Sequence, residues 1–89
     1  MIVLVMNFRM KSGKEYIRKM QRHTRQEPGC RLYVGHQSLE DPLLFCFYEQ
    51  YDDQAALDAH RAAPYFAEYV SNGLTTLAET RQAGRFEPV

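Results

Sequence analysis

The residues of this chain that are best suited to chemistry lie between Glu27 and Phe66, and several of them stand where an apolar strand gives way to an amphipathic helix. Glu49 supplies a carboxylate, and His60 supplies an imidazole whose ordinary pKa of about 6.5 lets it accept a phenol proton at neutral pH. A phenolate gives up an electron to dioxygen far more readily than a phenol does. We therefore interpret His60 as a candidate general base and Glu49 as the group that orients it. The alternative is structural, with His60 bonding a backbone carbonyl or a carboxylate and Glu49 capping the following helix.

Several further side chains offer polar atoms beside apolar surface. Tyr33, Tyr51 and Tyr65 each combine an aromatic ring with a hydroxyl, which suits both stacking on a planar substrate and ordinary packing. Asn7 lies in an apolar segment, where an amide is costly to bury unless it is hydrogen-bonded. Its amide either holds an oxygen atom of a substrate or of a superoxide-like intermediate, or it faces solvent.

Patterns for other kinds of chemistry are missing from the sequence. His23 and His36 do not stand at metal-ligand spacing with His60, and the chain has no HxH, HxxxH or HExxH motif. It also lacks a glycine-rich phosphate loop and a nucleophile elbow. We therefore expect no metal site, and phosphoryl transfer and acyl transfer have no support.

Composition restricts the partners of the chain. Its 89 residues include 11 basic and 11 acidic side chains without a basic run, so nucleic acid is not expected. The apolar amino terminus is too short to span a bilayer and lacks the positive start of a signal peptide, so we expect a cytoplasmic protein that does not bind membranes. Cys30 and Cys46 are predicted to lie on paired strands, with Cys46 opposite about Val34. We therefore expect no disulfide and treat both thiols as small buried hydrophobic groups.

Apolar periodicity predicts the first three elements. Residues 1 to 9 form a nearly continuous apolar run of strand length. Ser12 and Glu15 have the spacing of a capping box, which predicts a helix that runs to about Gln26. From Cys30 onward apolar and polar residues alternate, as in a half-buried strand.

The next strand is apolar on both sides. Residues 43–48 follow a turn signal at residues 40–42 and contain almost only apolar side chains. Because 45% of the chain is hydrophobic and 12% is aromatic, it has more apolar material than a small core requires. We therefore predict that helices cover one face of this strand and that the sheet of a second subunit covers the other.

The remainder of the chain completes an α+β pattern. Asp52 or Asp53 can cap a short helix, and Pro64 suits the first turn of another. Residues 84–89 are predicted to form a short final strand at a sheet edge. The order of strands and helices predicts one ferredoxin-like domain with an antiparallel sheet over residues 1–89.

Five short motifs together resemble a known family. Their order and spacing are similar to those of the antibiotic biosynthesis monooxygenase (ABM) domain, particularly its small quinol monooxygenase-like members. The motifs are Glu27-Pro28-Gly29-Cys30, Asp41-Pro42, Tyr48-Glu49, Ala55-Ala56-Leu57-Asp58-Ala59-His60 and Pro64-Tyr65-Phe66. The resemblance implies a dimeric α+β barrel with a cavity between sheet and helices in each subunit. It also implies oxidation of phenols, hydroquinones or polyketide aromatics by dioxygen without metal or flavin.

Several positions depart from the patterns of that family. Tyr51 stands where a Trp is usual, and Tyr65 stands where a His is often found. In the haem-degrading branch the resemblance would pair an Asn, matched by Asn7, with a Trp and an axial His. The chain has no Trp, and Val70 occupies the position of that His.

We accordingly predict a homodimeric, cofactor-independent monooxygenase that oxidises a small quinol or polycyclic phenol with dioxygen. His60, assisted by Glu49, would form the phenolate, and Asn7 with Tyr51 or Tyr65 would position oxygen atoms. Phe66 and Tyr33 are further candidate substrate contacts. A non-catalytic dimeric module that binds an apolar metabolite is the main alternative, and haem degradation is a third.

Overall fold

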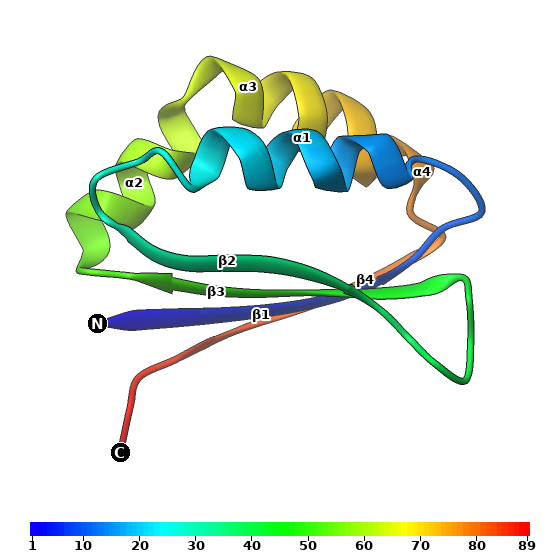
Figure 1. Ribbon diagram of the computed structural model, residues 1–89, viewed down its shortest axis with the longest axis horizontal. Helices are drawn as coiled ribbons and strands as arrows, with labels where there is room; N and C mark the ends of the chain where they lie inside the picture. The colour runs from blue at the N-terminus through cyan, green and yellow to red at the C-terminus, as the bar shows by residue number, and fades with distance from the viewer.

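The computed structural model describes residues 1–89 and places every helix on one face of a four-stranded antiparallel sheet (Figure 1). The strand order is β2-β3-β1-β4. The elements are β1 (Ile2–Arg9), α1 (Lys14–Thr24), β2 (Cys30–Gln37), β3 (Leu44–Tyr51), α2 (Gln54–Ala62), α3 (Pro64–Phe66), the π-helix η1 (Ala67–Leu74), α4 (Thr75–Leu77) and β4 (Thr80–Phe86). This arrangement confirms the predicted ferredoxin-like α+β fold.

Two predicted boundaries are wrong. Helix α1 begins after Gly13, whose φ of 112° favours glycine, and no side chain caps its first turn. The capping box expected from Ser12 and Glu15 therefore does not form. Strand β4 begins at Thr80 and not at residue 84, because its first residues pair with β1 although they carry little apolar signal. An edge strand that is mostly exposed needs no apolar alternation, so its sequence does not reveal it.

The helical segment after α2 begins at a sharp break. Ala63 has extended backbone (ψ 139°), which is the conformation that a residue before proline favours, and Pro64 opens α3. The segment then widens into the π-helix η1, which contributes Val70, Gly73 and Leu74 to the interior. A Cβ atom on Gly73 would lie 3.2 Å from the Tyr16 ring, so the missing side chain permits the close approach of α1 and η1.

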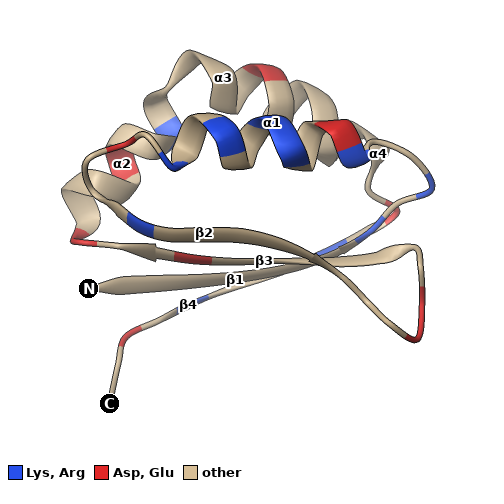
Figure 2. Ribbon diagram, in the orientation of Figure 1, with Lys and Arg blue, Asp and Glu red and all other residues tan.

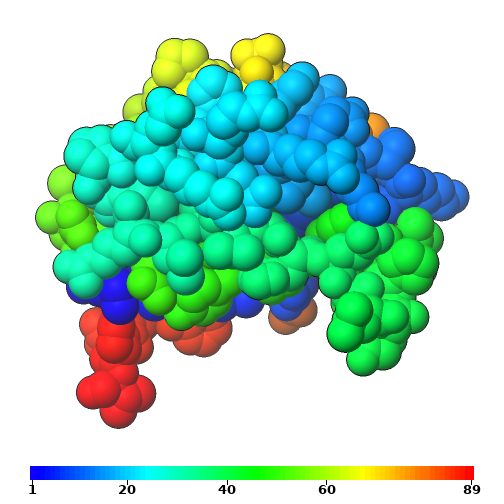
Figure 3. Space-filling view, viewed as in Figure 1, coloured from blue at the N-terminus to red at the C-terminus, as the bar shows by residue number.

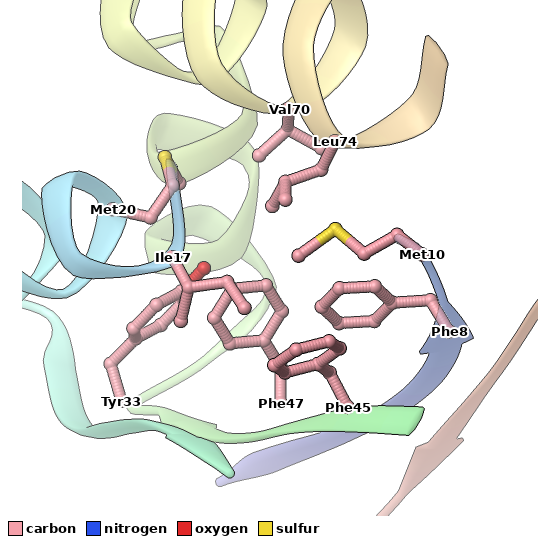
Figure 4. Close-up of a cluster of buried hydrophobic side chains, with 9 residues drawn as sticks. All are labelled: Phe8, Met10, Ile17, Met20, Tyr33, Phe45, Phe47, Val70 and Leu74. Atoms are coloured by element: carbon pink, nitrogen blue, oxygen red, sulfur yellow. The ribbon is translucent and has the colours of Figure 1, made fainter. Parts of the chain in front are cut away.

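The core lies between the sheet and the helices (Figure 4). Phe8 stacks on Phe45 with ring centroids 5.9 Å apart and contacts Phe47 at 5.4 Å, which joins β1 to β3. Helices α1 and η1 close the core from above with side chains at helical spacing. The buried cluster consists of Phe8, Met10, Ile17, Met20, Tyr33, Phe45, Phe47, Val70 and Leu74.

The other face of the sheet has no covering layer within the chain (Figure 1). Leu32 is 40% exposed and Phe86 is 57% exposed, and both lie on this open face according to the strand register. Figure 3 shows the C-terminal residues and the β2–β3 loop projecting past the sheet on the same side. The second subunit expected over residues 43–48 remains a prediction.

Strand register places the two cysteines apart. Cys46 is paired with His36 and Cys30 with Tyr51, so the predicted partner of Cys46 was wrong by two residues. The β2–β3 connection is centred on Asp41, within the predicted turn, and the Asp41 carboxylate accepts a hydrogen bond from the backbone N–H of Leu43. No helix in the structure combines the length and apolarity that a bilayer crossing requires.

Candidate active site

The imidazole of His60 is buried at the inner face of α2. Asp53 caps this helix by accepting a hydrogen bond from the backbone N–H of Ala56 at 2.9 Å, which fixes where α2 begins. Leu57 and His60 then share the face that packs onto the sheet, and the His60 side chain is only 2% exposed. The ring of Phe66 meets the imidazole edge-on, with centroids 5.2 Å apart. Helix position and aromatic packing together hold the imidazole inside the fold.

Glu27 contacts one ring nitrogen of His60. Its Oε2 lies 3.0 Å from His60 Nδ1 and also accepts a hydrogen bond from the Tyr65 hydroxyl. An ionised carboxylate only accepts hydrogen bonds, so Nδ1 must carry the proton in this contact. Nε2 of the neutral imidazole is then unprotonated, with its lone pair available as a base.

Glu49 lies near the second ring nitrogen. Its Oε1 is 3.9 Å from His60 Nε2, which is too long for a hydrogen bond, and it accepts a 2.6 Å bond from the Tyr51 hydroxyl. Burial raises the pKa of Glu49 to about 7, against the opposing effects of the Tyr51 hydrogen bond and of the Arg61 charge. Burial also lowers the pKa of His60, which Glu27 partly opposes. Near neutral pH the site therefore favours an uncharged imidazole.

A cavity of about 490 Å³ opens between the sheet and the helices beside these groups. This volume lies within the range of about 300 to 1,000 Å³ that is typical of small-molecule sites. His60, Glu49 and Tyr33 face it, and most of its other walls are apolar. The lining residues are Leu4, Val5, Met6, Tyr33, Phe47, Glu49, His60, Arg61, Phe66, Val70, Arg81, Ala83, Gly84 and Arg85.

The structure brings four of the seven predicted site residues to this cavity: His60, Glu49, Tyr33 and Phe66. Tyr51 and Tyr65 do not line it. Their hydroxyls instead bind the carboxylates of Glu49 and Glu27, so they support the site and do not contact its space directly.

The predicted role of Asn7 needs correction. Asn7 is exposed and pairs with Cys46 and Gln82, which alternate with the strand residues that face the helices. Phe8 points into the core, so its neighbour Asn7 must point away from it. Asn7 lies on the open face of the sheet and does not reach the cavity of its own chain.

Sequence reasoning missed four charged residues at the site: Glu27, Arg61, Arg81 and Arg85. Glu27 meets His60 across 33 residues of sequence. From the sequence it was known only as the first residue of the motif Glu27-Pro28-Gly29-Cys30 and had no role at the site. Arg81 and Arg85 lie on β4 on either side of Ala83, and the start of that strand was misplaced. Arg81, Ala83 and Arg85 stand at every second position, which places them on one face of a strand. This spacing was the sequence signal that could have placed both arginines on the same side of the sheet.

Comparison with known proteins identifies the family. Residues 1–72 match the family model described as antibiotic biosynthesis monooxygenase. The chain therefore belongs to the ABM family. It is also 35% identical over 83 residues to an uncharacterized protein, sll1783, of Synechocystis, an alignment that covers 88% of this chain and 56% of that protein. The chain thus spans little more than half the length of this curated relative.

Solved structures share the fold over nearly the whole chain. One, described as an antibiotic biosynthesis monooxygenase, superposes with a TM-score of 0.91 at 26% identity and covers 100% of this chain and 99% of its own. The structure of PA3566 from Pseudomonas aeruginosa gives a TM-score of 0.89 at 26% identity and covers 99% of this chain and 93% of its own.

Proposed function

We propose that this ABM-family protein is a cofactor-independent monooxygenase that oxidises a small quinol or polycyclic phenol with dioxygen. In the overall reaction an aromatic C–H becomes C–O and the substrate loses two hydrogen atoms in net terms. One oxygen atom of dioxygen enters the product and the other leaves as water, so the four electrons that reduce dioxygen all come from the substrate. The family name and the geometry around His60 support this proposal.

The observation that carries the proposal is the orientation of the imidazole. Glu27 holds Nδ1 of His60, which leaves Nε2 free, and His60 is one of the residues that line the cavity. In the proposed reaction Nε2 accepts the proton of a phenol hydroxyl. The lowered pKa of His60 keeps the ring uncharged before the reaction, so it is ready to accept that proton. The resulting imidazolium would lie beside the carboxylate of Glu27, which stabilises the new charge.

The cavity walls suit the step that follows. A phenolate transfers one electron to dioxygen and produces a pair of radicals, a phenoxyl and a superoxide. Recombination of this pair forms a C–O bond, and the His60 imidazolium returns its proton to the resulting peroxide anion. The hydroperoxide then loses water, with the hydrogen of the same carbon, and gives the carbonyl of the product. Apolar side chains such as Leu4, Phe47 and Val70 exclude water, which would otherwise separate the two radicals.

Oxygen uptake with a panel of hydroquinones and naphthols tests the proposal. The wild type should consume dioxygen well above the autoxidation rate of each compound, and His60→Ala should lower the enzymatic rate by about 10² to 10⁴-fold, the usual contribution of a general base. His36→Ala is the matched control, because His36 is exposed and does not line the cavity.

The same measurement distinguishes the enzyme from a non-catalytic module that only binds an apolar metabolite. If wild type and His60→Ala both consume dioxygen at the autoxidation rate, the chain is not a monooxygenase for these compounds. Retention of ligand binding under those conditions would instead support the binding module.

A further inference from the structure

Three arginine side chains line the cavity without an acidic partner. Arg61 comes from α2, whereas Arg81 and Arg85 come from β4. None of the three takes part in any of the ion pairs of the structure. All three are exposed, so they form the solvent side of the cavity. No ion pair within the chain therefore neutralises their positive charge.

Neutral oxygen atoms hold two of these arginines in place. Arg81 Nη1 donates to Thr75 Oγ1 at 2.9 Å, and Arg85 Nη2 donates to Gln54 Oε1 at 2.6 Å. Such bonds restrict the side chains but leave the guanidinium charge intact. Each guanidinium retains further N–H donors for a second partner.

Strand register aims the two β4 arginines toward the cavity. Arg85 is paired with Leu4 and Arg81 with Phe8, so both point to the helix side of the sheet. Ala83 lies between them on the same side and leaves space where a larger residue would fill the opening. Figure 2 shows basic positions on β4 below the helices. Arg61, next to His60 on α2, approaches the same cavity from the helical layer.

The opposite charge in the cavity is weak near neutral pH. Glu49 is the only acidic residue among the lining residues, and burial raises its pKa to about 7. The cavity thus has a base at its inner wall, apolar sides and three cations at its opening. A neutral phenol would use the first two features and leave the cations unmatched.

We infer that the cavity accepts an aromatic acid: a planar phenol or quinol that carries a carboxylate on the side remote from the hydroxyl that meets His60. The carboxylate would bind Arg81 or Arg85, because planar guanidinium groups match carboxylate geometry and charge-assisted bonds are the stronger kind. The choice of His60 as the reacting end rests on the function proposed above, but the preference for an anion does not.

Anaerobic binding of 6-hydroxy-2-naphthoic acid and of its methyl ester tests this inference without turnover. The two ligands share the ring and the hydroxyl and differ in charge. In low salt the wild type should bind the acid at least about tenfold more tightly than the ester, as one well-placed charged hydrogen bond allows. The preference should shrink in high salt, because the arginines are exposed to solvent.

Charge variants locate the preference. The double variant Arg81→Gln/Arg85→Gln should bind acid and ester equally, with the affinity for the ester unchanged. Arg22→Gln removes one positive charge from the exposed side of α1 and should keep the full preference. Thermal melts of all variants should agree with the wild type, because both β4 arginines are exposed. Equal binding of acid and ester by the wild type, or binding of neither, would overturn the inference.

Oxygen uptake separates this inference from the proposed function. If His60→Ala keeps the tenfold preference for the acid while no phenol is oxidised by the wild type, the anion site stands and the monooxygenase proposal fails. If phenols are oxidised but the charge of the ligand makes no difference to binding, the monooxygenase proposal stands and the anion site fails.

Discussion

At the scale of single residues, the contact between Glu27 and His60 determines which ring nitrogen is available. Replacing Glu27 by Gln removes the carboxylate that holds the Nδ1 proton and that raises the pKa of His60. We expect Glu27→Gln to lower kcat by about 10 to 100-fold, part of the contribution of a general base. We also expect the acidic limb of the pH–rate profile to move to lower pH, because His60 then protonates less readily.

A pH–rate profile of Glu27→Gln with a hydroquinone checks both effects. Glu68→Gln, which alters an exposed carboxylate on η1, is the matched control. Movement of the acidic limb to higher pH would contradict the role assigned to Glu27.

Glu49 makes stability depend on pH. Burial raises its pKa from 4.5 to about 7, so between these values the folded protein binds a proton that the unfolded chain has released. Wild-type stability should therefore fall as the pH rises through this window. Glu49→Gln stays neutral and can still accept the Tyr51 hydrogen bond, so it should gain on the wild type by up to about 3 kcal/mol between pH 4 and pH 8.

Urea unfolding of Glu49→Gln and of the wild type at several pH values measures this difference. Both proteins contain His60, so its own titration contributes to both curves. A stability difference that stays constant from pH 4 to pH 8, as in a surface control such as Glu68→Gln, would show that Glu49 ionises as easily in the folded protein as in the unfolded chain.

Residue chemistry alone identified part of this site. His60 and Glu49 were predictable because a helical and a strand spacing each place them on an inward face. Glu27 was not, since its contact with His60 depends on how the turn after α1 meets α2. Asn7 was misplaced because an apolar run does not reveal which alternate residues of a strand face inward.

At the scale of elements, a glycine determines how closely α2 packs. A Cβ atom on Gly29 would collide with the Cβ atom of Ala56, in the first turn of the helix that carries His60. Gly29→Ala should therefore displace α2, lengthen the contact between Glu27 and His60, and lower oxygen uptake more than it lowers the melting temperature.

Compensation at Ala56 tests that explanation. The double variant Gly29→Ala/Ala56→Gly removes the colliding methyl group and should recover most of the activity. It should keep a stability loss of about 1 kcal/mol from glycine in a helix. If the double variant is less active than Gly29→Ala alone, the collision is not the cause.

The order of elements could be predicted because each long element has a clear period. The exact ends could not, as the first turn of α1 and the start of β4 show. Gly13 replaces a side-chain cap with a left-handed backbone, and β4 gains its pairing from β1 without apolar alternation of its own. Both boundaries depend on neighbours in space and not on local sequence.

At the scale of the whole molecule, the uncovered sheet face explains the surplus of apolar residues. Val34 and Tyr48 are paired on that face and half-buried, beside the more exposed Leu32. We expect this face to join two copies, so light scattering should give a particle of about twice the chain mass of 10.4 kDa. Val34→Lys places a charge in the contact and should shift the particle toward a single chain.

Ser71→Lys adds the same charge on the exposed side of η1 and should leave the particle size unchanged. A wild-type particle of 10.4 kDa at micromolar concentration would refute the dimer.

The placement of the cavity has a consequence for such a pair. Because the cavity lies on the helical side of the sheet and the contact would form on the other, each reaction chamber is walled by one polypeptide. The two subunits of such a dimer would act independently, so the kinetics should not be sigmoidal. Inactivation of one subunit would leave the turnover rate of the other unchanged. Association would then bury an apolar surface that is otherwise exposed to water, while each subunit carries out catalysis with its own residues alone.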